Sequence, residues 1–452
     1  MAARLIESLA TPVPLAEVFS DMSVLQAMLD FERALARAEA GIGILPKSAA
    51  DRIAAAARAS EFDIHALSRA MFRSGTPGIP LVKALTEKVR ARDPDVAGWV
   101  HWGATSQDVA DTALVLLLKR AHTIIAGDLE RLEKALITLS RQHKATVMLG
   151  RTLMQAAPPV TFGLKAAGWL GAVSRGSRRL ESAFGEALVL QFGGASGTLA
   201  SLADKGTAVA RALAEELGLS CPEAPWHTHR DRLANLVCCC GVLTGSLGKI
   251  ARDISLLMQS EVAEVAEPGG EGRGGSSTMP HKRNPIACAL ALAAAERVPG
   301  LVASFLSAMV QEHERAVGGW QSEWPTVASI VQSTGSAAAS LAELAEGLLV
   351  DPARMRQNIA NTKGLIFAER AMMLLAAQLG RDVAHKLLED TIQKSLTQNK
   401  DLSALLAELP EVSSRLNRSA LDQLEIPEQY LGSAEEFREA LLNSVISNKG
   451  GR

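Results

Sequence analysis

The residues best suited to chemistry lie in one segment, positions 267–285, which separates two long apolar patterns. Its first half contains five glycines within the seven positions 269–275, and glycine loses the most conformational freedom when a segment becomes ordered. Its second half carries hydroxyl, cationic and amide side chains beside two stiffening prolines: Ser276, Ser277, His281, Lys282, Arg283 and Asn284. Such a segment could close over an anion, donate hydrogen bonds to it and exchange a proton with it.

A nucleotide phosphate is not the anion that this segment indicates. Glycine-rich phosphate loops need either the spacing Gly-x-x-x-x-Gly-Lys-Ser/Thr or the dinucleotide spacing after a strand, and the segment has neither pattern. The other interpretation is a solvated linker whose basic residues are incidental.

Three strings resemble one enzyme superfamily. GSSTMPHKRNP at 275–285 is similar to the signature loop of the fumarase/aspartase superfamily. HWGATSQD at 101–108, and GRT at 150–152 followed by Gln155 and Pro159, agree with that superfamily in order and spacing. The resemblance covers essentially the whole chain, and it implies an enzyme that acts on a small carboxylate-bearing molecule without a metal or other cofactor.

The resemblance also implies roles for individual residues. Ser277 would carry a proton to and from carbon, His101 would contact the substrate or orient other groups, and Lys282 would hold a developing negative charge. The expected substrate contacts come from the same strings and from two arginines elsewhere: Thr105, Ser106, Arg151, Thr152, Gln155, Arg230, Ser276, Met279, His281, Asn284 and Arg315. Arginine suits such contacts because its guanidinium binds a carboxylate through two parallel hydrogen bonds.

Four strings resemble the cycloisomerase branch of the superfamily: GIPLVKAL at 78–85, LQFGGASG at 190–197, PWHTHRDR at 225–232 and QEHER at 311–315. That branch implies closure of 3-carboxy-cis,cis-muconate to 4-carboxymuconolactone, in the protocatechuate branch of the β-ketoadipate pathway. In adenylosuccinate lyases the Arg-Thr pair is followed by a histidine that protonates the leaving group, whereas this chain has Leu153 there. A lactone exchanges a carboxylate, whose pKa is about 4, and such a group needs no acid to leave or attack.

Three alternatives stay open at this point. The chain could be an adenylosuccinate lyase-like enzyme that cleaves a C–N bond and releases fumarate, although Leu153 disfavours this. It could lactonise a sulfonated muconate, because arginine binds either anion. It could also be a non-catalytic structural member of the family, which the intact serines, Lys282 and Asn284 disfavour.

A metal site is not expected. His227 and His229 are two positions apart, but no third ligand follows at helical spacing and no cysteine or carboxylate pairs with them. Trp226, Trp320 and Trp324 could line a pocket or fill the core.

The elements that must hold these residues are predicted to be helices. Only 4% of the residues are aromatic, and long apolar patterns at helical spacing run over about 108–144, 161–191, 232–264, 284–316 and 326–350. A shorter helix is predicted from Asp21 to Gly41. We therefore expect an all-α fold with a small helical domain (1–107), a central long-helix bundle (108–350) and a helical cap (351–452).

Several of the long patterns are apolar on more than one face, as in residues 287–295. A helix of that kind is buried on all sides, so bundles from several subunits are expected to pack together. The resemblance implies a homotetramer with a twenty-helix core and active sites shared between subunits.

Charge and cysteine content restrict the partners. The net charge of −2 disfavours bulk attraction to nucleic acid or to an anionic membrane. Five cysteines, three of them adjacent at 238–240, do not form a disulfide framework. No signal peptide pattern is present at the N-terminus, and a cytoplasmic location is expected.

Overall fold

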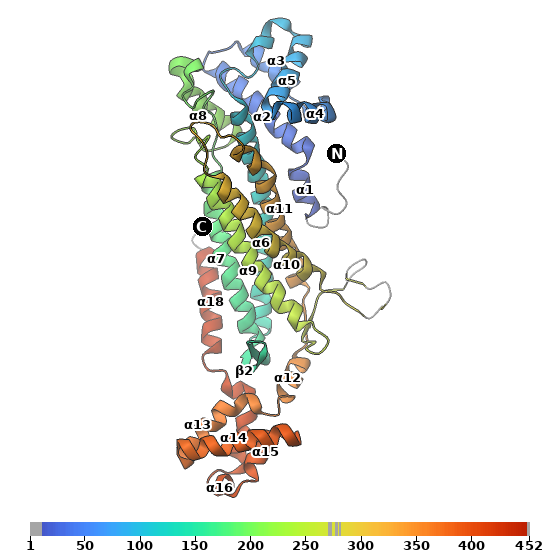
Figure 1. Ribbon diagram of the computed structural model, residues 1–452, viewed down its shortest axis with the longest axis vertical. Coiled ribbons are helices and arrows are strands. Elements are labelled where there is room, and N and C mark those ends of the chain that lie inside the picture. The colour runs from blue at the N-terminus through green and yellow to red at the C-terminus, as the bar shows by residue number, and fades with distance from the viewer. Residues whose placement is uncertain (1–10, 270–273, 276–278, 280–281, 450–452) are drawn as a thin grey trace. The chain divides into compact units, whose positions relative to one another are not determined.

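The computed structural model describes residues 11–269, 274–275, 279 and 282–449, and its fold is all-α, as the sequence predicts (Figure 1). Five long helices correspond to the five apolar patterns: α6 (Ser106–Gln142), α7 (Phe162–Ala187), α9 (Asp231–Leu257), α10 (Ile286–Ala308) and α11 (Gly319–Glu346). Most of them end several residues earlier than predicted. Helix α11 begins earlier than predicted, at Gly319, and continues through Pro325, which removes one hydrogen bond from the helix interior.

The chain divides into two compact units, and each of the five long helices contributes residues to both. The first unit comprises Met1–Glu130, Arg175–Lys249 and Ala289–Leu341, and the second comprises Arg131–Ser174, Ile250–Cys288 and Ala342–Arg452. The three-part division at 107 and 350 follows changes in helix length rather than these units, and it stays a prediction.

The first unit adds shorter helices to its share of the long ones: α1 (Val13–Val18), α2 (Asp21–Gly41), α3 (Lys47–Ala56), α4 (Ile64–Ser74), α5 (Gly78–Arg92) and α8 (Gly206–Leu217). Helix α2 begins and ends where the sequence predicts, and the Ser20 hydroxyl accepts from the Ser23 amide at its start. Helix α2 packs against α3 and α8.

Glycines allow the long helices of the first unit to approach closely. A Cβ at Gly176 of α7 would lie 2.8 Å from Leu243 of α9, and one at Gly248 of α9 would lie 2.5 Å from Ala295 of α10. Both distances are shorter than real carbon contacts, so a larger side chain at either position would push the helices apart.

The second unit contains a β-hairpin that the helical periodicity did not predict. Strand β1 (Val147–Thr152) pairs antiparallel with β2 (Gln155–Thr161), and the two-residue turn is Leu153–Met154, with φ values of +49° and +66°. A two-residue turn with two positive φ angles usually contains glycine, asparagine or aspartate. The sequence therefore lacks the residues that would have indicated this hairpin.

The rest of the second unit is a short ribbon and a group of small helices. Strand β3 (Val265–Ala266) pairs with β4 (Leu349–Val350). The helices are α12 (Pro352–Ala360), α13 (Ala368–Leu379), α14 (Arg381–Gln398), α15 (Leu402–Ala407), α16 (Pro410–Ser413), α17 (Arg418–Asp422) and α18 (Ala434–Lys449). Leu375, Leu388 and Leu406 belong to the core that α13, α14 and α15 share.

Two helices, α9 and α10, are long and apolar enough to cross a membrane. Length and composition alone are weak evidence, since core helices of soluble proteins have the same properties. In α10 only 28% of the most apolar window is buried within the described chain.

Candidate functional site

The start of α6 brings Thr105 and Arg315 together in the first unit. Thr105 precedes the helix, and its amide donates to the Asp108 carboxylate at 3.1 Å. One Arg315 Nη donates to Thr105 Oγ1 at 3.0 Å, and the other donates to the carbonyls of Gly194 and Ala195 at 3.1 and 2.7 Å. A helix N-terminus and a guanidinium both favour negative charge. This corner therefore suits a carboxylate, with Ser106 as the first residue of the helix.

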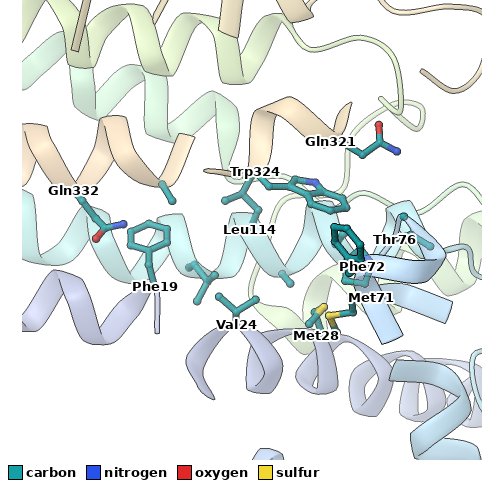
Figure 2. A pocket seen from close by; sticks show the side chains of 16 residues that line it. Phe19, Val24, Met28, Met71, Phe72, Thr76, Leu114, Gln321, Trp324 and Gln332 are labelled. Atoms are coloured by element: carbon teal, nitrogen blue, oxygen red, sulfur yellow. The ribbon is translucent and has the colours of Figure 1, made fainter. Parts of the chain in front are cut away.

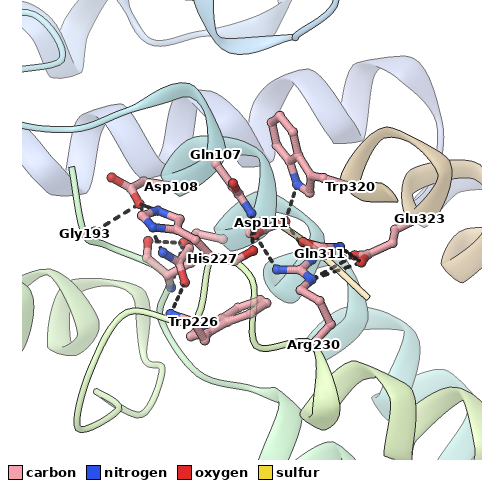
Figure 3. Close-up of polar contacts among 12 residues, drawn as sticks. Gln107, Asp108, Asp111, Gly193, Trp226, His227, Arg230, Gln311, Trp320 and Glu323 are labelled. Atoms are coloured by element: carbon pink, nitrogen blue, oxygen red, sulfur yellow. Dashed lines mark hydrogen bonds and ion pairs between the residues drawn. The ribbon is translucent and has the colours of Figure 1, made fainter. Parts of the chain in front are cut away.

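Asp108 holds the loops around that corner (Figure 3). Its carboxylate accepts from His227 Nε2 at 2.8 Å and from the amides of Gly193 and Gly194 at 3.0 and 2.9 Å. Asp108 is fully buried, and a buried carboxylate is stable only when donors satisfy it. The aspartate thus fixes segments that lie far apart in the sequence. His229 is exposed, and the described residues contain no group of three or more His, Cys, Asp or Glu side chains that could hold a metal.

His101 lies in the turn before α6 and contacts Glu32 of α2. Nδ1 of His101 is 2.6 Å from Glu32 Oε1, and the Glu32 side chain is fully buried. Burial works against a charge on His101, but the charge and hydrogen bond of Glu32, followed by the charge of Asp108, raise its pKa above the ordinary value. The imidazole therefore keeps its proton to higher pH than a free histidine.

A second buried acid lies on the same face of α2. Both carboxylate oxygens of Glu39 lack a hydrogen-bond partner among the described residues, and burial, then the charge of Glu32, raises its pKa to about 9 from the ordinary 4.5. Glu39 is therefore neutral at pH 7.

We expect Glu39→Gln to raise the free energy of unfolding by about 3 kcal/mol at pH 7. A raised folded-state pKa means that the wild type is fully stabilised below pH 4.5 and loses stability as the pH rises towards 9. Glutamine has no proton to lose, so its advantage should vanish at pH 4. Urea unfolding at pH 4 and pH 7 measures this, and an equal difference at both pH values would contradict it.

Arg230 differs most from its expected role as a carboxylate clamp for the substrate. Its guanidinium lies between Asp111, with contacts of 2.7 and 3.1 Å, and Glu323, with contacts of 2.6 to 3.1 Å (Figure 3). Trp320 Nε1 also donates to Asp111, and Arg230 itself is 1% exposed. Since two protein carboxylates already occupy the guanidinium, the geometry supports a structural role rather than substrate binding.

In the second unit, the hairpin presents Arg151 beside a buried acid. Its guanidinium binds Glu264 through two hydrogen bonds of 2.7 and 3.0 Å, and Asn358 Nδ2 donates to the same carboxylate at 2.8 Å. Glu264 is completely buried, whereas Thr152 and Gln155 are exposed at the end of the hairpin. Glu264 therefore fixes the direction in which Arg151 presents its remaining donors.

We expect Glu264→Gln to raise KM for a carboxylate substrate roughly tenfold and to change kcat little. A hydrogen bond to a charged partner contributes about 1.5 to 3 kcal/mol, and its loss leaves Arg151 free to adopt other rotamers. Steady-state kinetics measures the effect, and Glu261→Gln, in the same loop but exposed, serves as the control. A fall in kcat at constant KM would argue against a positioning role.

The signature segment is fixed at its base. Glu267 accepts from the amides of Ala287 and Cys288 at 3.1 and 3.0 Å, at the start of α10. Further in, the Asn284 amide donates to the Gly274 carbonyl at 3.0 Å. Met279, Lys282 and Asn284 line a cavity of about 700 Å³. Ser276, Ser277 and His281 lie outside the described residues.

A second cavity, of about 610 Å³, lies in the first unit (Figure 2). Phe19, Met71, Phe72, Leu114 and Trp324 contribute to its wall, and none of the described residues that line it is charged. A tricarboxylate needs cations, so this cavity is not the candidate substrate site. From the sequence, Trp324 could either line a pocket or fill the core. In the structure it lines this cavity.

Sequence reasoning missed three carboxylates that hold candidate residues in place: Glu32, Asp108 and Glu264. A signal existed for Glu32, because it falls on the apolar stripe of a predicted helix, where a charge requires a partner. No comparable signal existed for Glu264, since its partner Arg151 is more than a hundred residues away.

Family models and known proteins are similar to this chain over most of its length. A family model described as lyase matches residues 10–300, and one described as adenylosuccinate lyase C-terminus matches residues 364–441. A 3-carboxy-cis,cis-muconate cycloisomerase from Bradyrhizobium diazoefficiens is 49% identical, with 94% of each chain covered. A nitrosuccinate lyase from Streptomyces davaonensis is 42% identical, with 96% of this chain and 94% of that protein covered.

A solved structure is also similar over nearly the whole chain. The 3-carboxy-cis,cis-muconate lactonizing enzyme from Pseudomonas putida is 46% identical with a TM-score of 0.93, over 98% of this chain and 99% of that chain. The chain therefore belongs to the lyase family, the fumarase/aspartase superfamily that its signature segment resembles.

Proposed function

We propose that the chain catalyses the cycloisomerisation of 3-carboxy-cis,cis-muconate to 4-carboxymuconolactone. The observation that carries the proposal is Leu153, which stands where an adenylosuccinate lyase-like enzyme needs an acid. Leu153 is 96% exposed at the turn of the hairpin that carries Arg151 and Gln155. An aliphatic side chain cannot protonate an amine as it leaves, whereas a carboxylate needs no proton. The names of the relatives support the same substrate.

The proposed reaction is an isomerisation that needs no reactant besides the substrate and one exchangeable proton. A carboxylate oxygen of the substrate forms a C–O bond to one carbon of a C=C bond. The electron pair of that double bond moves onto the carboxylate attached to its other carbon, which becomes a dianionic aci-carboxylate. The carbon that bears the aci-carboxylate then takes a proton from Ser277, and the serine hydroxyl regains a proton from solvent. In ring opening Ser277 takes that proton back. Lys282 and Asn284 hold the dianion.

The other carboxylates of the substrate need their own donors. Thr105, Ser106 and Arg315 form one anion-binding corner, and Arg151, Thr152 and Gln155 offer donors on the hairpin. Ser276, Met279, His281 and His101 complete the proposed set. Arg230 is not among the proposed substrate contacts, because it pairs with the buried Asp111 and Glu323.

A homotetramer with active sites shared between subunits is part of the proposal. Apolar side chains on and just after α10 stay uncovered in one chain, with Leu306 42% and Val310 87% exposed. Burying such a face against other copies is favourable in proportion to the apolar area removed from water. Sedimentation equilibrium measures the mass, and a monomer at micromolar concentration would contradict this part.

We place the protein in the cytoplasm. All five cysteines are unpaired, among them the adjacent Cys238, Cys239 and Cys240, as is usual in a reducing compartment.

A nitrosuccinate-cleaving lyase is the second candidate. One relative of 42% identity bears that name, and a nitro group leaves as a weakly basic anion, so Leu153 does not argue against it.

The test is a panel of four substrates followed by absorbance: 3-carboxymuconate, nitrosuccinate, adenylosuccinate and argininosuccinate. Loss of the conjugated-diene band of 3-carboxymuconate is the expected result. Fumarate released from a succinyl substrate, or cleavage of nitrosuccinate alone, would replace the proposal with a lyase. No reaction with any of the four would favour the non-catalytic alternative.

A further inference from the structure

Two glutamates of α2 are buried on its apolar face. Glu32 is 1% and Glu39 is 0% exposed, and they lie seven positions, about two turns, apart. Within the described chain, Oε2 of Glu32 and both carboxylate oxygens of Glu39 have no hydrogen-bond partner. Such burial of a charge is unfavourable unless a partner compensates it. For Glu32 the compensating partner is His101, whose Nδ1 lies 2.6 Å from Oε1.

The backbone around His101 is arranged to keep this contact. His101 has φ of +62°, a conformation that side-chain-bearing residues adopt rarely. Gly103, two residues on, has φ of +69° and packs so closely on Leu202 that a Cβ would lie 2.7 Å from its side chain. Strain of this kind persists where surrounding structure imposes it, and it gathers at functional sites.

The orientation of the ring decides which atom is available. Nδ1 faces the buried carboxylate, so Nε2 is the nitrogen left to bind a ligand, and the side chain remains 15% exposed. No hydrogen bond of Nε2 to another described residue is present. An ionised Glu32 requires a proton on Nδ1, and a second proton on Nε2 makes the ring a cationic donor.

We infer that Glu32 is the positioning residue of His101, holding the ring as an imidazolium whose Nε2–H faces a carboxylate of the substrate. This inference rests on the proposed function. It gives His101 the role of a fixed positive charge, where the sequence left open whether it contacts substrate or orients other groups.

The charges around His101 favour that state. Glu32 of α2 and Asp108 of α6 are the two anions that raise its pKa against the effect of burial. Glu39 is neutral at the working pH and adds no charge. On the other side of α2, Arg37 pairs with Glu216 of α8, and Lys205 donates to the carbonyls that end the helix. These groups point away from the ring because they lie about half a turn from Glu32 or beyond the helix end.

The first experiment measures kcat/KM against pH for the wild type, Glu32→Gln and Glu39→Gln. Activity that needs the imidazolium is lost as the pH rises through the raised pKa of His101. In Glu32→Gln the alkaline limb of the profile, the pH range in which activity falls, should move to lower pH by about one unit or more. The variant should lose roughly tenfold in kcat/KM at pH 7.5. Glu39→Gln makes the same chemical change on the same helix face, and it should leave the limb in place.

The second experiment needs no turnover. Diethyl pyrocarbonate modifies neutral imidazole, and peptide mass spectrometry reports the extent at His101 as a function of pH. The pH at which half of His101 is modified should fall in Glu32→Gln by the same amount as the alkaline limb of kcat/KM. In Glu39→Gln this midpoint should stay constant. If the wild type has no cycloisomerase activity, the proposed function fails and the substrate contact of His101 fails with it, but this midpoint still decides whether Glu32 keeps His101 protonated.

Either of two results would overturn the inference: midpoints unchanged in Glu32→Gln, or equal shifts in the two variants. If Glu32→Gln does not fold, as judged by circular dichroism, Glu32→Asp replaces it. Aspartate keeps the charge at a longer distance, so its midpoint should lie below that of the wild type, and an unchanged midpoint would again contradict the inference.

Discussion

Replacing Ser277 by alanine is expected to lower kcat roughly a hundredfold to ten-thousandfold, the usual contribution of a positioned proton carrier. A tricarboxylate competitor should still bind with nearly unchanged affinity, because the proposal assigns the carboxylate contacts to other residues. An isolated hydroxyl is a weak acid and a weak base, so the proton transfer depends on donors that stabilise the developing charge. In the proposed mechanism Lys282 and the amides of Gly274 and Gly275 would be those donors.

The measurement combines stopped-flow absorbance for turnover with calorimetry for competitor binding. Thr278→Ala, the next position, carries no assigned role and serves as the control, with activity close to that of the wild type. A Ser277→Ala variant that turns over normally would remove this residue from the mechanism. A variant that loses binding and turnover together would make Ser277 a substrate contact instead of a proton carrier.

The helical part of the fold was predictable because the signal is local. Apolar residues at helical spacing and a paucity of aromatics and strand formers indicate long helices without knowledge of their partners. Helix α2 was predicted to its last residue, since Gly41 ends the periodic pattern. Helix α10 ends at Ala308 although apolar residues continue, which shows that an apolar stripe alone does not mark a helix end.

The hairpin was not predictable for the opposite reason. Its turn consists of Leu153 and Met154, both with positive φ, and neither residue favours that conformation. Pairing with β2 and packing of Val147 and Leu149 against the C-terminal helices of the second unit compensate the turn. Those contacts are long-range, and no short window of sequence contains them.

The candidate site divides in the same way. Residues inside motifs, such as Thr105, Arg151 and Lys282, could be named because short local strings carry the resemblance to the superfamily. The contacts that hold them in place could not be predicted. Arg315, named only as a substrate contact, reaches Thr105, and Glu264 reaches Arg151, both across more than a hundred residues. Arg230 shows the converse: its string suggested a substrate contact, while its partners Asp111 and Glu323 became visible only in three dimensions.

Arg230→Met should lower the free energy of unfolding by about 3 to 5 kcal/mol, the usual effect of removing one partner from a buried ion pair. The variant leaves Asp111 and Glu323 buried without their cation, and both carboxylates are completely shielded from water. Burial already raises the pKa of Glu323 despite the arginine beside it, so without Arg230 this group should take up a proton more readily. The destabilisation should therefore shrink as the pH falls from 7 to 5, which urea unfolding at several pH values measures.

Two comparison variants separate this effect from loss of side-chain volume. Arg232→Met, two positions on, removes an arginine whose partner Glu223 is 92% exposed, and it should change stability by less than about 0.5 kcal/mol. The triple variant Arg230→Met, Asp111→Asn, Glu323→Gln removes the two uncompensated charges together with the cation, and it should recover most of the lost stability. If the triple variant were as unstable as Arg230→Met, packing around Trp226, over which the guanidinium lies at 4.6 Å from the ring centre, would account for the loss rather than charge. If Arg230→Met were as stable as the wild type, Arg230 would be free to act on a ligand, and its place among the substrate contacts would be restored.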